Sequence, residues 1–461
     1  MIEIKEQVET LLEEAIQRLR TSGNDMQLVS FTKQITKADP LHFFEAAKYM
    51  DKDRTFWTST TDDFYLVGVG NACEIIATDS RYKETEDKWK KILEEAIIHN
   101  PYEVAGTGIV TMGGMAFDPK KKQTELWHKF KPSHFTLPEM MLTKSDDGFY
   151  FTINIQVKKD DHPVQLATHL NCLEKQFFKH QTIGSNHLFI KEKENIEADQ
   201  WKKSILHATE EIRQSNIEKI VLAREVRLIF NKEADITVTL QGLIQTQPNS
   251  YIFAFEKGED CFVGATPERL VKLEKQQLLS TCLAGTAARG KTMEEDQKIS
   301  NGLLHDKKNR QEHDFVVQMI KEGIKDYCTN LNIPNEPVIY PLKNLQHLYT
   351  PVTATLKNGY SIFDIIKQLH PTPALGGTPK LDSLSYIRDH ELLDRGWYGA
   401  PIGWMDSNQN GEFAVAIRSG LIQGDEASLF AGCGVVKDSD PEAEYEETNI
   451  KLLPMLSVLG G

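Results

Sequence analysis

The strand-like segments of this chain come in clusters, and helical segments fall irregularly between the clusters. Residues 250–290 form a run of short strand patterns with glycine-containing turns, and residues 397–436 predict three more strands, the first two joined across residues 408–411. A repeated strand–helix–strand fold would alternate the two elements regularly. The clustering therefore predicts the α+β class, built on large antiparallel sheets.

Hydrophobic spacing and turn signals indicate further elements. Helices are predicted over residues 1–20, 80–98 and 301–328, and from Pro441 after the N-cap residue Asp440. Strands are predicted over residues 64–70, 106–119 and 218–230, and residues 134–157 are predicted to hold two strands, one on each side of the turn at 145–148. The polar segments 157–164 and 190–200 are candidate linkers.

The charge balance limits the kind of partner. With 53 Lys and Arg against 67 Asp and Glu, the formal net charge is −14, which argues against broad binding to nucleic acid or to anionic membranes. A small anionic substrate stays compatible, because a metal ion and a few buried cations can reverse the field locally. The apolar stretches are too short to cross a bilayer, and the charged N-terminal helix is unlike a signal peptide. The six scattered cysteines form no CxxC pair, so we expect reduced thiols and a cytoplasmic location.

Several common catalytic motifs are absent from the sequence. It contains no GxxxxGK[ST] loop, no GxGxxG between a strand and a helix, no HExxH or paired Cys/His zinc spacing, and no GxSxG elbow. The glycine-rich segments 106–114 and 376–377 are interpreted first as backbone turns, with a ligand-contacting loop as the alternative.

Oxygen-rich side chains gather on the predicted C-terminal helix. Glu444, Glu447 and Lys451 stand at i, i+3 and i+7 and so share one face. Two carboxylates near a helix N-terminus suit a hard divalent cation such as Mg²⁺, and Glu312 on the 301–328 helix is a candidate ligand opposite them. The alternative is a solvated acidic first turn, favoured by the helix dipole.

Two further residues could exchange protons with a substrate. Lys219 opens the 218–230 strand, and a lysine held against the inside of a sheet could act as a general base. Glu268 follows a tight turn directly after a strand, where a rigid sheet can place a carboxyl group for acid–base work. The alternatives are an exposed strand-end lysine and a surface ion pair between Glu268 and Arg269.

Taken together, ten ordered segments resemble a known family. They are KIVLARE, FVGATPERLV, LAGTAARG, DKKNRQEHDFVVQ, LYTPVTATL, LHPTPALGGTPK, DRGWYGAPIGW, FAVAIRSGLI, AGCGVV and EYEETNIKLLPML, spread over residues 218–456. In this order they resemble the chorismate-utilising enzymes, which include isochorismate, anthranilate, aminodeoxychorismate and salicylate synthases. The segment GGMAFDP in the N-terminal part fits the family more loosely.

The resemblance implies a fold and an activity. The family fold is a large α+β unit of layered antiparallel sheets packed together with helices outside, and we expect a less typical N-terminal region (1–200) intertwined with a catalytic region (201–461). Lys219 matches the water-activating base that amine-transferring members replace with Gln, and Ala374 matches the small residue of isochorismate synthases. We therefore expect an Mg²⁺-dependent isomerase that adds water at C2 of chorismate with loss of the 4-hydroxyl, of the menaquinone-pathway type. Alternatives are a salicylate synthase, an anthranilate or aminodeoxychorismate synthase large subunit, and a non-catalytic sensor.

The resemblance also assigns roles to individual residues. Lys219 is the expected base and Glu268 the expected acid, while Glu312, Glu447 and Glu444 are the expected Mg²⁺ ligands. Substrate contacts are expected from Gly285, Thr286, His370, Ala374, Tyr398, Arg418, Gly432 and Lys451, with only a supporting role for His370. No obligatory protein partner is expected.

Overall fold

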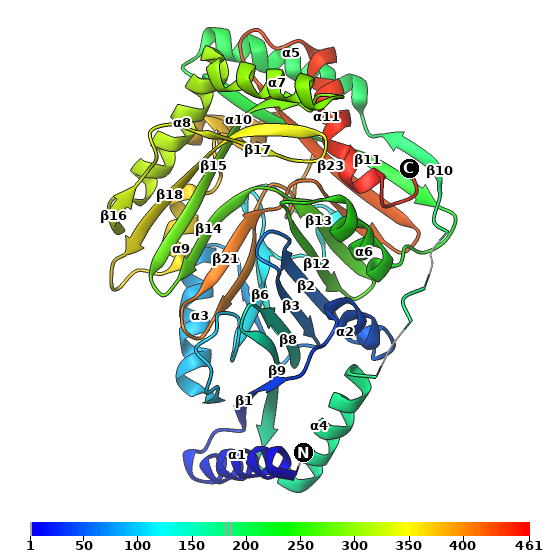
Figure 1. The fold of residues 1–461 in the computed structure, drawn as a ribbon, viewed down its shortest axis with the longest axis vertical. Helices are drawn as coiled ribbons and strands as arrows, with labels where there is room; N and C mark the ends of the chain where they lie inside the picture. Colours follow the sequence, from blue (N-terminus) through cyan, green and yellow to red (C-terminus); the bar gives the residue numbers. More distant parts are fainter. Residues whose placement is uncertain (1, 180–181, 185–186) are drawn as a thin grey trace.

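Two large, mainly antiparallel sheets pack against each other in the computed structural model, which describes residues 2–179, 182–184 and 187–461 (Figure 1). The predicted α+β class is confirmed. Aromatic side chains fill the space between the sheets: Trp57 and Phe253 from the first sheet meet Trp404 from the second, together with Trp397 from a connecting loop. Their burial contributes to the hydrophobic packing that holds the layers together.

The described strands form one sheet of thirteen strands and one of ten. In spatial order the first contains β10 (Ile190–Asn195), β11 (Lys219–Phe230), β23 (Glu426–Val435), β22 (Ser419–Gln423), β13 (Asp260–Thr266), β12 (Tyr251–Lys257), β2 (Arg54–Ser59), β3 (Phe64–Val69), β8 (Met140–Ser145), β9 (Gly148–Lys158), β1 (Met26–Ile35) and β5 (Ile97–His99), with β19 (Gly377–Thr378) beside β11. The second contains β16 (Cys328–Asn332), β18 (Leu345–Leu356), β15 (Gln277–Ala288), β14 (Arg269–Glu274), β21 (Gly411–Val415), β20 (Pro401–Asp406), β6 (Val110–Met115), β7 (Ser133–Leu137) and β4 (Cys73–Ala77), with β17 (Val338–Pro341) beside β18.

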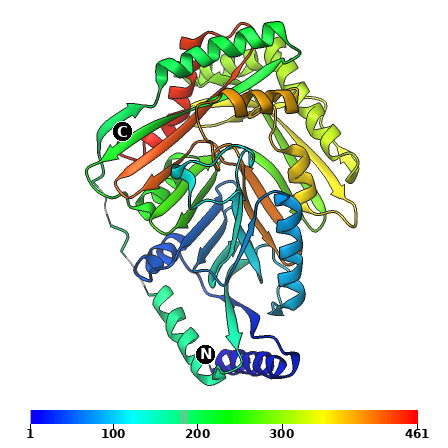
Figure 2. The same cartoon turned by 180° about the vertical axis from the view of Figure 1, so that it is seen from behind.

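The helices lie around these sheets. They are α1 (Ile2–Ser22), α2 (Pro40–Ala46), α3 (Arg81–Glu95), α4 (Pro163–Phe177), α5 (Ala198–Gln214), α6 (Ile236–Thr246), α7 (Met293–His305), α8 (Lys307–Ile324), α9 (Ile362–Leu369), α10 (Lys380–His390) and α11 (Pro441–Leu456), with short 3-10 turns at Ala47–Tyr49 and Glu125–Trp127. In both views α1 and α4 lie at one end of the molecule, whereas α5, α7 and α11 lie at the other (Figures 1 and 2).

The N- and C-terminal halves of the chain contribute strands to both sheets. The division at residue 200 stays a prediction, because strand pairing alone does not define a folding unit. Among the described residues, none of the helices is long and apolar enough to span a bilayer.

Five predictions about local structure were wrong. The helix predicted over residues 80–98 ends at Glu95, and residues 97–99 form the strand β5 instead. The 301–328 helix is two helices, because Asp306 accepts a hydrogen bond from the Asn309 N–H and caps a new helix, α8, while Cys328 already opens β16. The candidate linker 190–200 contains the edge strand β10. Residues 397–436 hold four strands, and residues 133–158 hold three, since β7 precedes the hairpin of β8 and β9.

Candidate active site

The chain crosses from one sheet to the other at two neighbouring points. Glu268 lies between β13 of the first sheet and β14 of the second, and Arg418 lies between β21 of the second and β22 of the first. The two crossings are hydrogen-bonded to each other: the Ala265 N–H donates to the Arg418 carbonyl at 3.1 Å, and the Val415 N–H donates to the Glu268 carbonyl at 3.0 Å. Both side chains therefore reach the same region at the sheet ends.

This region is a cavity of about 1300 Å³. Of the thirteen residues predicted for the site, twelve line it: Lys219, Glu268, Gly285, Thr286, Glu312, Ala374, Tyr398, Arg418, Gly432, Glu444, Glu447 and Lys451. The thirteenth, His370, does not line it. Its imidazole is buried against Phe117, with Nε2 3.3 Å from the Gly399 carbonyl. The supporting role of His370 stays a prediction.

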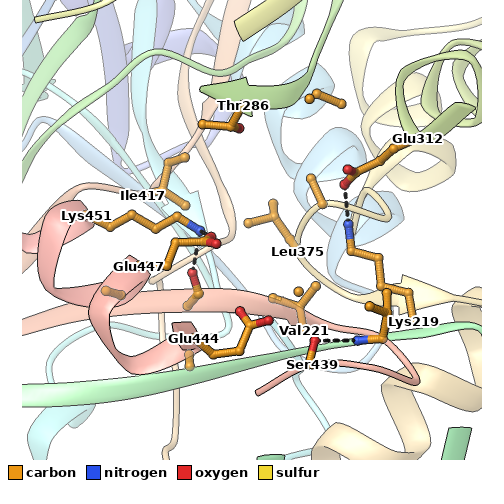
Figure 3. Close-up of a pocket in the computed structure, with 18 of the residues that line it drawn as sticks. Lys219, Val221, Thr286, Glu312, Leu375, Ile417, Ser439, Glu444, Glu447 and Lys451 are labelled. Atoms are coloured by element: carbon orange, nitrogen blue, oxygen red, sulfur yellow. Dashed lines mark hydrogen bonds and ion pairs between the residues drawn. The ribbon is translucent and has the colours of Figure 1, made fainter. Parts of the chain in front are cut away.

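Strand β11 directs alternate side chains into the cavity. Lys219, Val221 and Ala223 line it, whereas the residues between them face the other way. The Lys219 ammonium lies 2.7 Å from Glu312 Oε1 on α8 (Figure 3). A Cβ on Gly434, in the neighbouring strand β23, would lie 2.5 Å from Lys219 Cε, so a larger residue there would require the lysine side chain to shift from this position. The alternative of a free, exposed strand-end lysine does not describe this arrangement.

Glu268 has the environment of a group that is protonated near neutral pH. Burial raises the pKa of Glu268 from 4.5 to about 7, although a hydrogen bond from Thr372 and the charge of Arg418 act in the opposite direction. Thr372 Oγ1 donates to Glu268 Oε1 at 3.4 Å. The alternative of an ion pair with Arg269 fails, because Arg269 pairs with Glu412 and Asp62 instead.

Two cations on the cavity wall suit an anionic ligand. Arg418 is only 9% exposed, and within the described part of the chain none of its guanidinium nitrogens bonds a protein acceptor. Burial lowers the pKa of Arg418, while the nearby Tyr398 and Glu447 raise it. Hydrogen bonds to an incoming carboxylate would compensate for the hydration that this buried cation has lost. Lys451 Nζ donates to the Gly432 carbonyl at 2.8 Å and lies 2.5 Å from Glu447 Oε1.

His347 is a site residue that the sequence reasoning missed. It lies on β18, lines the cavity, and is hydrogen-bonded through Nδ1 to Thr286 Oγ1 at 3.0 Å. Burial, with the charges of Arg418 and Lys451, lowers the pKa of His347 to about 3, so the imidazole is neutral. Its buried Nε2 has no hydrogen-bond partner in the described structure. It directly precedes the segment LYTPVTATL, which was the available signal, but such a histidine is hard to tell from one in the core.

The carboxylates predicted to hold Mg²⁺ come from two sides of the cavity. Glu312 projects from α8, while Glu444 and Glu447 project from α11 (Figure 3). Within residues 2–179, 182–184 and 187–461, no three acidic, His or Cys side chains stand close enough to form a metal site. Their chemistry nevertheless fits a hard cation: burial and the negative charge of Glu447 both raise the pKa of Glu444, and a divalent cation would relieve that repulsion.

An amine, a carboxyl group that titrates near neutral pH and a buried unpaired cation thus share one cavity. Such a set can remove a proton from one atom of an anionic substrate and deliver a proton to another. The functional class follows from this geometry together with the sequence relationships. The chain belongs to the chorismate binding enzyme family, which matches residues 14–460.

Two curated relatives match almost the whole chain. The chain is 41% identical to isochorismate synthase MenF of Bacillus subtilis, over 95% of this chain and 94% of that protein. It is 33% identical to a salicylate biosynthesis isochorismate synthase of Pseudomonas aeruginosa, over 94% of this chain and 91% of that protein.

Solved structures share the fold. The menaquinone-specific isochorismate synthase MenF of Escherichia coli matches with a TM-score of 0.79 at 24% identity, covering 98% of this chain and 99% of that one. Anthranilate synthase component I of Streptococcus pneumoniae matches with a TM-score of 0.64 at 17% identity, covering 94% and 92%. The second match shows that an anthranilate synthase component shares this fold, so the fold alone does not identify the reaction.

Proposed function

We propose that the protein is an isochorismate synthase, an isomerase that converts chorismate to isochorismate by adding water at C2 with loss of the 4-hydroxyl. The observation that carries this proposal is the pairing of an amine, Lys219, with a carboxyl group of pKa about 7, Glu268, in one cavity. The relatives named isochorismate synthase, at 41% and 33% identity over nearly the full chain, support it.

The reaction needs one proton removed and one delivered. In its neutral form Lys219 takes a proton from the attacking water, and protonated Glu268 gives a proton to the departing 4-hydroxyl, which leaves as water. The ring double bonds shift, so atoms and charge balance. The next cycle requires Lys219 to lose a proton and Glu268 to regain one. A pKa of about 7 lets Glu268 hold its proton at neutral pH and still release it.

The two carboxylates of the substrate need cationic partners. Arg418 and Lys451 suit this role because they supply charge-assisted hydrogen bonds from the cavity wall. Backbone groups of Gly285, Thr286 and Gly432 complete the expected contacts. Gly285 has φ +78°, a conformation that favours glycine, at an irregularity in the pairing of β15 with β18.

Mg²⁺ is part of the proposal. Glu312, Glu444 and Glu447 would hold it, and when bound it would neutralise a substrate carboxylate and fix the position of the ring. In the described structure Glu312 and Glu447 are instead neutralised by Lys219 and Lys451.

The pathway and location are also proposals. The relatives named MenF support a role in menaquinone biosynthesis. All six cysteines are free, which agrees with a reducing, cytoplasmic environment. We propose that activity needs no protein partner.

The test is a product analysis. The purified protein is incubated with chorismate and Mg²⁺, with and without ammonia, and the products are separated by chromatography. We expect isochorismate in both reactions. Salicylate with pyruvate would indicate a salicylate synthase, and anthranilate or aminodeoxychorismate formed only with ammonia would indicate an amine-transferring enzyme. Either result would overturn the proposal.

A further inference from the structure

Strand β11 has a second face that the mechanism does not use. Lys219, Val221 and Ala223 point into the cavity, so Arg224, one residue further, points to the opposite side, towards α5 and α11. Arg224 is 2% exposed. A cation buried this deeply is unfavourable unless its surroundings compensate for the lost hydration.

The direct contacts that compensate for it are with neutral groups, and most of these groups belong to α11. Arg224 Nε donates to Thr448 Oγ1 at 2.7 Å, and Arg224 Nη2 donates to Asn449 Oδ1 at 2.6 Å. The guanidinium also lies 4.2 Å from the ring centroid of Tyr445. A third hydrogen bond, 3.2 Å from Nη1 to Asn195 Oδ1, reaches β10. No carboxylate within the described residues forms a salt bridge with Arg224.

The α11 residues that Arg224 contacts lie on one face of the helix. Tyr445, Thr448 and Asn449 stand at i, i+3 and i+4 and therefore share a face of the helix. The proposed magnesium ligands Glu444 and Glu447 each precede a residue that Arg224 contacts by one position. The face that carries these two carboxylates is consequently rotated by about 100° around the helix axis.

Contacts that hold the face of α11 with Tyr445, Thr448 and Asn449 also determine where the face with Glu444 and Glu447 points. Side-chain ends lie about 5–6 Å from the axis of a helix, so a rotation of about 10° moves a carboxylate by about 1 Å. Metal coordination tolerates little displacement, because oxygen–Mg²⁺ distances are about 2.1 Å in near-ideal octahedral geometry. The metal site therefore requires α11 to keep a fixed rotation about its own axis.

We propose that Arg224 is a positioning residue, which fixes the rotation of α11 against β11 and thereby sets the carboxylates of Glu444 and Glu447 for Mg²⁺. This inference rests on the proposed function, specifically on its magnesium site. It joins the strand that carries the proposed base to the helix that carries the proposed metal ligands.

The test measures how strongly Mg²⁺ binds when the contacts between Arg224 and α11 are removed. Arg224→Met removes the donors at similar length, Arg224→Lys keeps the charge but cannot bond Thr448 and Asn449 with a planar fork, and Thr448→Val removes one acceptor while the arginine stays. For each variant we would measure the Mg²⁺ concentration at half-maximal rise of the melting temperature, with chorismate present, and the Mg²⁺ concentration for half-maximal activity.

We expect Arg224→Met to raise both Mg²⁺ midpoints about 10-fold, the usual order for residues that orient metal ligands. Arg224→Lys and Thr448→Val should shift them less, and adding Thr448→Val to Arg224→Met should add little, because the shared contact is already lost. The control is Leu12→Ala in α1, which truncates a buried side chain at the other end of the molecule (Figure 1). It should lower the melting temperature without moving either midpoint.

The outcomes separate this inference from the function on which it rests. Midpoints within twofold of wild type in Thr448→Val and in both Arg224 variants would overturn the positioning role while leaving the synthase proposal intact. The same holds if Leu12→Ala shifts the midpoints as much as Arg224→Met does. If the wild-type protein shows no Mg²⁺ response in melting or in activity, the magnesium site and the positioning role are both refuted. Isochorismate formation by the wild-type protein is judged separately.

Discussion

Replacing Glu268 with glutamine should make the protein more stable and nearly inactive at the same time. Glutamine matches glutamate in size but cannot ionise. In the folded protein burial raises the pKa of Glu268 from 4.5 to about 7, so the folded state holds this proton more tightly than the unfolded chain. Between those pH values the folded state binds more protons, and stability falls as pH rises through that range.

The size of the effect follows from the displaced pKa. The shift from 4.5 to about 7 corresponds to about 3 kcal/mol of lost stability once the pH is well above 7. Glu268→Gln removes that loss. The variant should therefore match wild type near pH 4.5 and exceed it by up to about 3 kcal/mol at pH 8.5. For a chain of 461 residues this is about 3 °C in melting temperature, at about 2.1 cal/mol/K per residue.

The assay combines melting curves from pH 4.5 to 8.5 with rates of isochorismate formation. Loss of a general acid should reduce kcat by about 10²–10⁴. Glu233→Gln, an exposed site, is the control and should change neither stability nor rate. The reasoning is refuted if Glu268→Gln shows the same pH dependence of stability as wild type, or if it keeps near-wild-type activity.

Four further outcomes are expected. Lys219→Gln should reduce the rate of water addition by about 10²–10⁴ with the fold intact; isochorismate production close to wild type would remove Lys219 from the mechanism. Gly434→Ala should lower kcat by about 10-fold or more, because its Cβ would lie 2.5 Å from Lys219 Cε and would displace the amine. The control is Gly302→Ala, in an open part of α7, which should leave kcat unchanged and add up to about 1 kcal/mol of helix stability. Arg418→Gln should raise the KM for chorismate about 10–100-fold, and an unchanged KM would show that Arg418 does not bind substrate. The wild-type rate should fall above pH 7 as Glu268 loses its proton; a rate that stays constant or rises above pH 7 would contradict the role of Glu268 as the acid.

Parts of the site could be predicted because local rules fix them. Alternation along β11 places Lys219 on the same face as Val221 and Ala223, and the i, i+3, i+7 spacing brings Glu444, Glu447 and Lys451 to one side of α11. These relationships depend only on strand and helix geometry.

Other parts depended on pairing between distant segments. The sequence shows that strands flank Glu268 and Arg418 but not which sheet each strand joins, so the two crossings between sheets were not predictable. Arg418 has φ +53°, and this left-handed backbone ends β21 and starts β22 in the other sheet, which is why three predicted strands became four.

The wrong predictions of individual helices and strands also have physical causes. Strand β10 carries mostly charged residues and lies at a sheet edge, so it has no hydrophobic alternation to reveal it. Hydrophobic spacing continues through residues 301–328 on both sides of Asp306, which conceals the boundary between α7 and α8. The aspartate before a helical run was the available signal.

The central claim is that solvent water, activated by Lys219, becomes the new hydroxyl of the product. The direct measurement is to run the wild-type reaction in water enriched in ¹⁸O and to determine the mass of the isochorismate by mass spectrometry. We expect each product molecule to carry one solvent oxygen, located at C2. Product whose hydroxyl at C2 retains the original oxygen of the substrate would show an internal transfer and would contradict the account.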